Sequence, residues 1–302
     1  MAKPLQTFSG DLLADRRADF AEMLFASGDI EAAAELMRGA MDLAPEWSLG
    51  WYRLGEFHEA AGATEGAVDA WRMARELDPA DRTGAALKLQ LAGAEPQQAN
   101  PSSGFAETLF DQYAKTFDES LVGKLGYRVP DLLADAIRSH APPQFDLAVD
   151  LGCGTGLMGE KIQPVAKRLD GYDISAEMLK KARARNVYDR LVKADLLEMD
   201  YGSDAADLVV AADVFIYLGA LERVTRLAAA MLRKAGLYAF SVERHEGTED
   251  FKLRPSRRYA HAEHYVRRVL ADAGFHVLSV AIEVIRHDRG APLDGLIVVA
   301  RR

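Results

Sequence analysis

The sequence predicts an α/β domain with a mainly parallel sheet, preceded by a smaller all-helical domain. The first part follows from residues 105–302, where short apolar segments that close on acidic residues alternate with helical segments, as in parallel sheets. The second part follows from a repeat with a 34-residue period within residues 1–94, a period that indicates stacked helical pairs. Residues 95–104, rich in Pro, Gln, Ser and Gly, are expected to form the linker.

A glycine-rich turn is the most informative feature of the α/β part. An apolar stretch closes on Asp150, and Gly152, Gly154 and Gly156 follow at alternate positions. This pattern predicts a buried parallel strand, a tight turn and the start of a helix. Glycine is needed where the backbone turns sharply or where a ligand lies directly on it. A second strand is expected to end at Asp173, at the spacing where a carboxylate binds ribose hydroxyls.

The charge at this turn distinguishes between cofactors. A dinucleotide brings a pyrophosphate to the helix N-terminus, and the carboxylate of Asp150 would repel it. S-adenosylmethionine instead carries an α-ammonium and a sulfonium, and both favour a nearby anion. The segment therefore resembles the class I S-adenosylmethionine-dependent methyltransferases. A nicotinamide cofactor and a purely structural strand–turn are the alternatives that the glycine pattern leaves open.

The resemblance implies a set of cofactor contacts. In the family, residues matching D-x-G-x-G-x-G line the methionine part, the second strand's acidic end binds ribose, and the third strand's acidic end binds the adenine amino group. Apolar residues enclose the adenine ring, although plain core packing is the alternative for Met178 and Leu196. The implied cofactor-binding residues are Tyr113, Asp150, Gly152, Gly154, Gly156, Asp173, Ile174, Met178, Asp195, Leu196 and Ala212.

Tyr113 enters this set because residues 110–118 resemble the F-D-x-Y-A-x-x-F-D pattern of small-molecule methyltransferases. In those enzymes the tyrosine lies across the cofactor pocket. Phe110, Tyr113 and Phe117 also follow helical spacing, so an ordinary amphipathic face is the alternative.

The remaining elements complete a Rossmann-like sheet. Ser175 is the expected N-cap of a helix over residues 176–185. The short connection between the last two strands requires them to be antiparallel. Seven strands with the last one reversed is the sheet of the class I methyltransferases. After the strands that end near Asp150 and Asp173, the others are expected at 189–195, 206–213, 237–243, 276–285 and 296–300.

The end of the fourth strand faces the transferable methyl group in this family. Asp213 and Tyr217 follow that strand, so they are the candidate catalytic residues, to orient or deprotonate an acceptor. The alternative is a strand-end or packing role. The N/D-P-P-Y/F/W motif of enzymes that methylate amide or nucleobase nitrogens is absent here, which disfavours such substrates.

A basic loop follows the fifth strand. Lys252, Arg254, Arg257 and Arg258 either hold an anionic substrate or form a solvated face. His261 and His264 lack neighbouring ligands at metal-site spacing, so no metal site is expected.

The N-terminal repeat resembles the tetratricopeptide repeat. A 34-residue shift aligns Gly28 with Gly62 and Pro45 with Pro79. Residues 82–92 are expected to form a solvent-facing capping helix. Together with the segments 259–265 and 286–296, the array resembles predicted methyltransferases that carry tetratricopeptide repeats. The repeat is interpreted as a module that binds a protein partner, or as a structural appendage.

Charge and composition limit the remaining functions. The net charge is −9, and residues 1–99 hold 9 Lys and Arg against 17 Asp and Glu. Such an acidic region argues against nucleic-acid binding. Cys153 is the single cysteine, and the sequence shows neither a signal-type segment nor a long apolar run. We therefore expect a cytoplasmic protein without membrane spans.

Three functions agree with these features. The first is a methyltransferase acting on an unidentified small-molecule or carrier-bound acceptor. The second is a protein methyltransferase whose repeat docks the target. The third is a catalytically silent S-adenosylmethionine-binding interaction protein.

Overall fold

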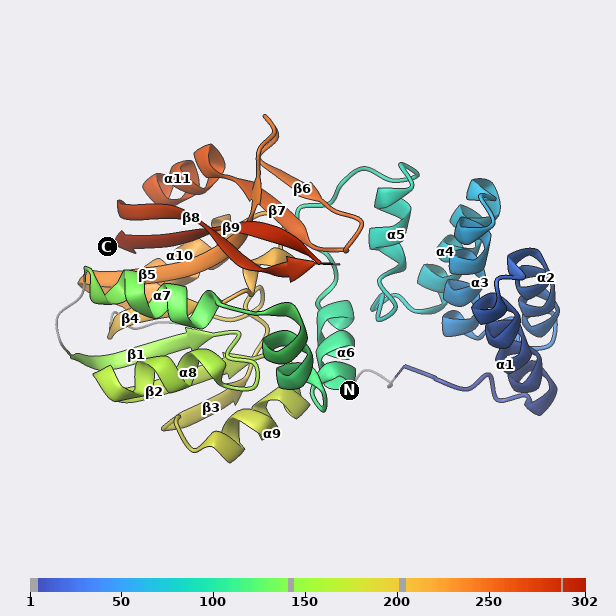
Figure 1. Ribbon diagram of the computed structural model, residues 1–302, viewed down its shortest axis with the longest axis horizontal. Helices are drawn as coiled ribbons and strands as arrows, with labels where there is room; N and C mark the ends of the chain where they lie inside the picture. Colours follow the sequence, from blue (N-terminus) through green and yellow to red (C-terminus); the bar gives the residue numbers. More distant parts are fainter. Residues whose placement is uncertain (1–4, 141–143, 201–204, 289) are drawn as a thin grey trace. The chain divides into compact units, whose positions relative to one another are not determined.

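The computed structural model describes residues 5–140, 144–200, 205–288 and 290–302. Position 289, within the C-terminal motif 286–296, therefore lies outside the described residues. The chain forms two compact units, residues 1–108 and 109–302, and Figure 1 shows the first in blue to cyan. In the described part of the chain, every helix is too short or too polar to cross a bilayer.

The first unit is all-helical, as predicted, and its helices recur with the period of the sequence. The second helix of each pair begins at Ile30 and at Thr64, 34 residues apart. Gly28, directly after the first helix, has a φ of +91°, and Gly62, two residues after the third, has a φ of +74°; both values favour glycine. The helices are α1 (Leu12–Ser27), α2 (Ile30–Met41), α3 (Ser48–Ala60), α4 (Thr64–Leu77) and α5 (Ala85–Leu91).

Close contacts join neighbouring helices of this unit. A Cβ on Gly55 would clash with the indole of the buried Trp71, so only glycine lets α3 approach α4 at this point. Arg53 donates to both oxygens of Glu22 at 2.6 Å. The expectation of a solvent-facing last helix is wrong, since Leu87 and Leu89 of α5 are buried. The apolar side chains of α5 are packed within the helical unit instead.

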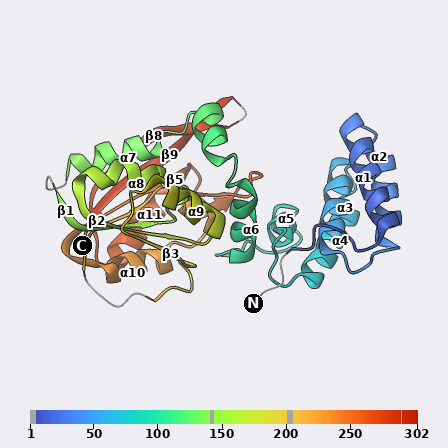
Figure 2. The same cartoon turned by 90° about the horizontal axis from the view of Figure 1, so that it is seen from below.

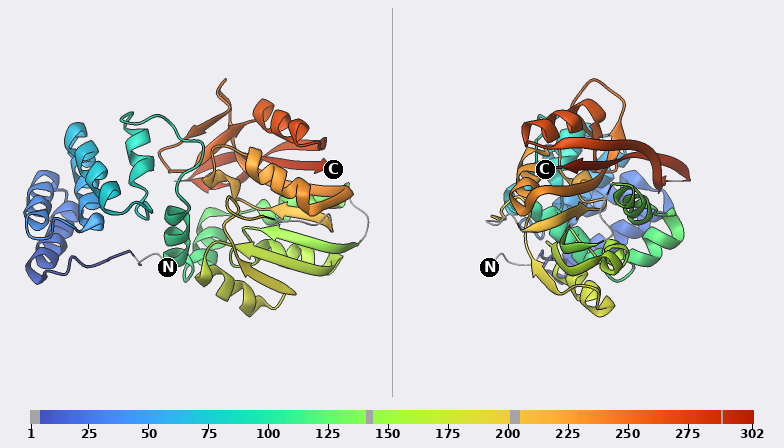
Figure 3. Two further views of the ribbon diagram at one scale, coloured as in Figure 1. Left: turned by 180° about the vertical axis from the view of Figure 1, so that it is seen from behind. Right: turned by 90° about the vertical axis from the view of Figure 1, so that its left-hand side faces the viewer.

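The second unit contains one mixed sheet with helices on both faces. Figure 1 shows α7 and α8 in front of the sheet, and Figures 2 and 3 show α10 on the opposite face. The helices are α6 (Ser103–Tyr113), which leads into this unit, α7 (Val129–Arg138), α8 (Leu157–Ile162), α9 (Ala176–Arg185), α10 (Glu222–Met231) and α11 (Glu263–Asp272), with a π-helical turn at Glu119–Lys124 and 3-10 turns at Gln163–Val165 and Phe215–Tyr217. The strands are β1 (Phe145–Leu151), β2 (Ala166–Asp173), β3 (Arg190–Lys193), β4 (Ala206–Ala211), β5 (Leu232–His245), β6 (Phe251–Leu253), β7 (Tyr259–Ala262), β8 (His276–Asp288) and β9 (Ala291–Arg301).

The strand order agrees with the predicted Rossmann-like sheet. The parallel strands run in the order β3-β2-β1-β4-β5. β9 pairs antiparallel with both β5 and β8, which confirms the reversed last strand. The carboxyl ends of β1, β2, β4 and β5 therefore lie along one edge of the sheet, where open α/β sheets bind ligands.

The predicted count of seven strands is not confirmed, because the sheet has nine strands among the described residues. The two additional strands, β6 and β7, form a short hairpin that joins the end of β5, with Glu243 opposite Ala260. The sequence suggested a basic loop after the fifth strand. The chain instead continues as strand through Ala262, and α11 begins at Glu263.

Two apolar cores flank the sheet. Alternating residues of the central strands point to opposite faces, as strand geometry requires. Ala148 and Leu208 pack with α7 and α8, while Val149 and Val209 pack with α10 and α11. These cores fix the strand ends that carry the candidate site.

Candidate active site

The three glycines between β1 and α8 have different roles. All have positive φ, at +66° for Gly152, +53° for Gly154 and +98° for Gly156. A Cβ on Gly152 would clash with Val214, and one on Gly156 would lie 3.0 Å from Arg185 Cδ. A Cβ on Gly154 would meet no described atom within 4 Å. Gly152 and Gly156 thus serve packing, and Gly154 leaves room for a ligand directly on the backbone.

Asp150 lies directly beneath this turn and is completely buried. Its Oδ2 accepts a hydrogen bond from Tyr188 Oη at 2.7 Å. Its Oδ1 is buried and has no hydrogen-bond partner among the described residues. Burial raises the pKa of Asp150 to about 7, and the hydrogen bond from Tyr188 opposes this effect. An ammonium group of a ligand would donate a hydrogen bond to this unpaired oxygen.

Tyr188, which sequence reasoning missed, occupies a slot made by glycines. A Cβ on Gly159 would clash with its phenol, and a Cβ on Gly171 would lie 3.0 Å from its ring. The slot explains why α8 and β2 carry glycine at these two positions. In the sequence, the two glycines indicate that a side chain packs closely at these positions, but they do not indicate which side chain it is.

Asp173, at the end of β2, connects two turns. Its Oδ2 accepts from Gly154 N and its Oδ1 from Ser175 N, both at 2.8 Å. Burial raises its pKa to about 6. Each oxygen retains a second lone pair for a ribose hydroxyl. Ser175 caps α9 by accepting from Met178 N at 3.1 Å, which confirms the predicted helix and its N-cap.

The residues expected to contact the adenine ring lie in the segments that directly follow β2, β3 and β4. Met178 and Leu196 are buried, whereas Ile174, Asp195 and Ala212 are half-buried. Asp195 lies two residues beyond β3, which ends earlier than predicted, at Lys193. Its Oδ1 accepts from Leu197 N at 2.9 Å, which leaves Oδ2 for a donor.

Two carboxylates, one in α6 and one just before the π-helical turn, hold this part of the chain against the turns that follow β1 and β2. Asp111 accepts from Ser175 Oγ at 2.5 Å. Asp118 accepts from Thr155 Oγ1 and from Arg185 Nη2, both at 2.5 Å. These contacts were not predicted, because their partners are 37 to 67 residues apart in the chain.

The aromatic side chains of this segment differ in placement. Tyr113, the expected cover of the cofactor, is 52% exposed. Phe110 instead packs edge-on against Tyr217, with 5.0 Å between ring centroids. Phe110 therefore contacts a candidate catalytic residue.

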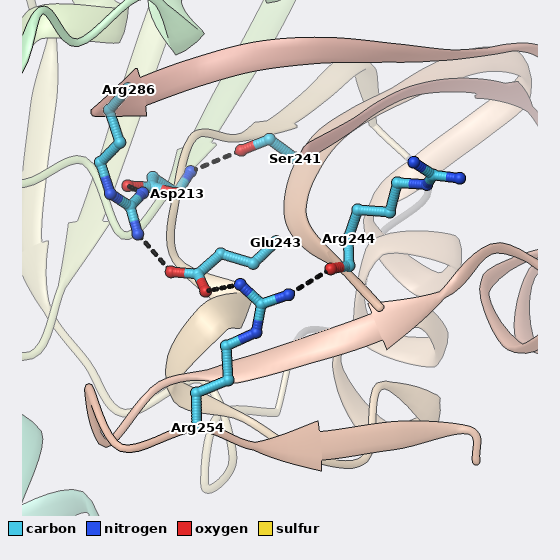
Figure 4. A network of polar contacts seen from close by, with 6 residues as sticks. All are labelled: Asp213, Ser241, Glu243, Arg244, Arg254 and Arg286. Carbon is cyan, nitrogen blue, oxygen red and sulfur yellow. Dashed lines mark hydrogen bonds and ion pairs between the residues drawn. The ribbon is translucent and has the colours of Figure 1, made fainter. Parts of the chain in front are cut away.

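Asp213, two residues after the end of β4, has a conformation that non-glycine residues seldom adopt, with a φ of +60°. Its N–H donates to Ser241 Oγ at 2.9 Å, and its Oδ2 accepts from Arg286 Nη1 at 2.6 Å. Its Oδ1 is buried with no partner among the described residues. Figure 4 shows Asp213 held between Ser241 and Arg286.

Glu243, at the end of β5, extends this network. It accepts from the fully buried Arg286 on β8. It also accepts from Arg254 Nη1 at 3.4 Å, and Arg254 Nη2 donates to the carbonyl of Arg244 at 2.5 Å. Burial raises the pKa of Glu243, whereas the positive charge of Arg286 lowers it.

Two tyrosines complete the charged site. Tyr217 accepts a hydrogen bond from Arg258, and this interaction with Tyr217 is the main reason that the pKa of Arg258 lies above its ordinary value. Burial raises the pKa of the Tyr127 phenol, and the negative charges of Asp213 and Asp150 raise this pKa further. Tyr127 thus lies near both the glycine turn and the end of β4, although sequence reasoning did not select it.

His261 has a structural role. Its Nε2 lies 2.9 Å from the Leu218 carbonyl oxygen, and burial lowers its pKa to about 4. His264 instead pairs with Asp250. The described residues contain no group of three His, Cys, Asp or Glu arranged to hold a metal ion.

Comparisons with known proteins agree with this geometry. Residues 149–240 match the profile of a family described as "Methyltransferase domain". Methyltransferase-like protein 27 of Homo sapiens is 36% identical over 27% of this chain and 34% of its own length. Malonyl-[acyl-carrier protein] O-methyltransferase of Enterobacter lignolyticus is 29% identical over 36% of this chain and 43% of its own. The chain thus spans less than half of the curated relatives that it matches.

The crystal structure of the [4+2]-cyclase SpnF shares the fold. It has a TM-score of 0.56 and 17% identity, and the match covers 68% of this chain and 97% of that one. The profile match, the strand order and the glycine turn define the α/β unit as a class I S-adenosylmethionine-dependent methyltransferase domain. The open space at Gly154 and the unpaired buried Oδ1 of Asp150 fit the methionine end of S-adenosylmethionine.

Proposed function

We propose that this protein transfers a methyl group from S-adenosylmethionine to a small-molecule or carrier-bound acceptor. The observation that carries the proposal is the buried charged cluster of Asp213, Glu243 and Arg286 at the ends of β4 and β5. This cluster lies on the same edge of the sheet as the glycine turn. Tyr127 interacts with the charges of Asp213 and Arg286 in the cluster and with the charge of Asp150 beside the turn.

The cofactor contacts follow from the placement of the side chains. Asp150 binds the α-ammonium of the methionine part, which lies over Gly152, Gly154 and Gly156. Asp173 binds the ribose hydroxyls. Asp195 accepts from the adenine amino group. Ile174, Met178, Leu196 and Ala212 enclose the ring, with Tyr113 at the rim.

Asp213 and Tyr217 orient the acceptor in this proposal. S-adenosylmethionine supplies an electrophilic methyl group, and transfer is an in-line displacement, so positioning accounts for much of the rate enhancement. The unpaired Asp213 Oδ1 accepts from a hydroxyl or amine of the acceptor, and Arg286 and Ser241 fix its direction. The Tyr217 hydroxyl donates on the same side.

The carrier-bound acceptor is supported by the relative named as an acyl-carrier-protein O-methyltransferase. Incubation of the full-length protein with labelled S-adenosylmethionine and metabolite pools or acyl-carrier-protein thioesters tests the proposal. We expect label transfer that the Gly154→Ala variant abolishes. Cofactor affinity without label transfer to any fraction would favour the silent binding protein.

A second candidate is a protein methyltransferase that docks its target on a tetratricopeptide-type repeat in residues 1–94. One observation supports it: the surface of α1 exposes apolar side chains that a partner would cover. Leu12, Phe20 and Met23 are 67%, 54% and 65% exposed, an unusual density for one solvated helix. Labelling of lysate proteins that is lost in a Phe20→Ser, Met23→Ser variant would support this alternative over the first.

A further inference from the structure

The β6–β7 hairpin brings two arginines to the acceptor end of the sheet. β7 pairs with the end of β5, where Ala260 lies opposite Glu243. The turn between the hairpin strands is closed by Arg254 N donating to the carbonyl of Arg258 at 2.8 Å. Arg254 and Arg258 therefore lie beside Glu243 because of this hairpin.

The charges of this cluster do not balance. Among the described residues, Arg254, Arg258 and Arg286 interact with two carboxylates, those of Asp213 and Glu243. Arg286 pairs with both carboxylates, and Arg254 pairs with Glu243 and a backbone carbonyl. One positive charge is left over.

Arg258 carries this excess charge. Its described side-chain partner is the phenol of Tyr217 and not a carboxylate. The charges of Asp213 and Glu243 also act on it, so it belongs to the same cluster. A guanidinium has five N–H donors, and a single phenol oxygen satisfies few of them. An excess charge in a partly buried site is costly unless a ligand of opposite charge neutralises it.

Resting on the function proposed above, we infer that Arg258 binds a carboxylate of the methyl acceptor, at the carboxyl end of β5. A guanidinium fork matches the two oxygens of a carboxylate. One carboxylate neutralises the single excess charge, whereas a phosphate monoester would bring close to two negative charges at pH 7. The charge count therefore favours a carboxylic acid over a phosphate ester. Asp213 Oδ1 remains available for a second, donating group of the same molecule.

Fragment binding tests this inference without knowledge of the acceptor. The full-length protein is titrated with propionate, with propionamide as the neutral isostere and with inorganic phosphate, and ligand-observed NMR detects binding. Each titration is made with and without S-adenosylhomocysteine. We expect propionate to bind, propionamide not to bind, and phosphate to bind more weakly. Arg258→Gln is expected to weaken propionate binding about tenfold or more, the usual effect of losing a charge-assisted pair.

Matched variants separate a local effect from a loss of folding. Arg258→Lys keeps the charge without the fork and is expected to fall between the wild type and Arg258→Gln. Arg267→Gln, on the exposed face of α11, should leave propionate binding unchanged. Equal binding of propionate by the wild type and Arg258→Gln would overturn the inference, as would tighter binding of phosphate or no binding of propionate at all. Calorimetry with S-adenosylhomocysteine on the same samples tests the cofactor assignment separately, because Arg258 is remote in sequence and role from the glycine turn.

Discussion

Tyr188 hydrogen-bonds Asp150 from beneath the glycine turn, with 2.7 Å between Tyr188 Oη and Asp150 Oδ2. The bond fixes the rotation of the carboxylate and leaves Oδ1 as the free, buried acceptor. Oδ1 is therefore the atom of Asp150 that meets the cofactor. The packing of Tyr188 among glycines therefore determines which oxygen of Asp150 is free to bind the ligand.

Tyr188→Phe tests this relationship. The phenylalanine ring keeps the slot against Gly159 and Gly171 filled, so the variant loses the hydrogen bond and little packing. We expect the free energy of unfolding to fall by about 1–3 kcal/mol, the cost of leaving a buried acceptor unsatisfied, as measured by urea denaturation. We also expect weaker binding of S-adenosylhomocysteine by calorimetry. An unchanged affinity would mean that the orientation of Asp150 does not matter for the ligand.

The pH dependence of cofactor affinity follows from the raised pKa of Asp150. This carboxyl titrates at about 7 in the folded protein against an ordinary value of 3.8. A folded pKa above the unfolded one means that the protonated carboxyl stabilises the free protein at low pH. That contribution is complete below pH 3.8 and is lost as the pH rises through about 7. The ammonium of the cofactor prefers the ionised form, so affinity should rise over the same interval.

Calorimetry between pH 5.5 and 8.5 measures this effect. We expect affinity for S-adenosylhomocysteine to weaken by up to about tenfold per pH unit below 7. Asp173, whose pKa is raised to about 6, adds to the loss at the acid end. Asp150→Asn should bind more weakly at pH 8 and show a flatter profile. An equally steep profile in this variant would assign the titration to another group.

Gly154→Ala should separate ligand contact from folding. The added Cβ meets no described protein atom within 4 Å, so its effects are backbone strain and obstruction of the ligand. Gly274 is a matched control because it also has a positive φ, +82°, with open space at its Cβ. Both variants should lose about 1 kcal/mol of stability from the left-handed conformation. Only Gly154→Ala should lose cofactor affinity, and an equal loss in Gly274→Ala would make strain the cause.

The sequence predicted the sheet and its cofactor edge because these depend on local patterns. The glycines after β1, the acidic strand ends and the cap at Ser175 are all readable within a few residues. The reversed β9 followed from the length of one connection. These features require no knowledge of distant partners.

The acceptor end was less predictable because its contacts join distant segments. Arg286 meets Asp213 across 73 residues and Glu243 across 43. The hairpin of β6 and β7 has strands of only three and four residues, too short for an alternating strand pattern to be recognised in the sequence. Tyr188 was missed for a related reason, since glycines mark a space but not its occupant.

We expect the α/β part of the chain to bind its cofactor without the repeat. We propose residues 1–94 as the repeat domain, 95–104 as the linker and 105–302 as the methyltransferase domain. A protein of residues 95–302 keeps α6 whole and retains the glycine turn, the acidic strand ends and the Asp111 and Asp118 contacts. We expect it to bind S-adenosylhomocysteine as tightly as the full chain and to keep turnover on a small acceptor. If the repeat docks a protein, turnover on that protein alone should be lost, and salt should weaken docking because the repeat is acidic. A shortened protein that folds by circular dichroism but does not bind the cofactor would show that the domain boundary is misplaced.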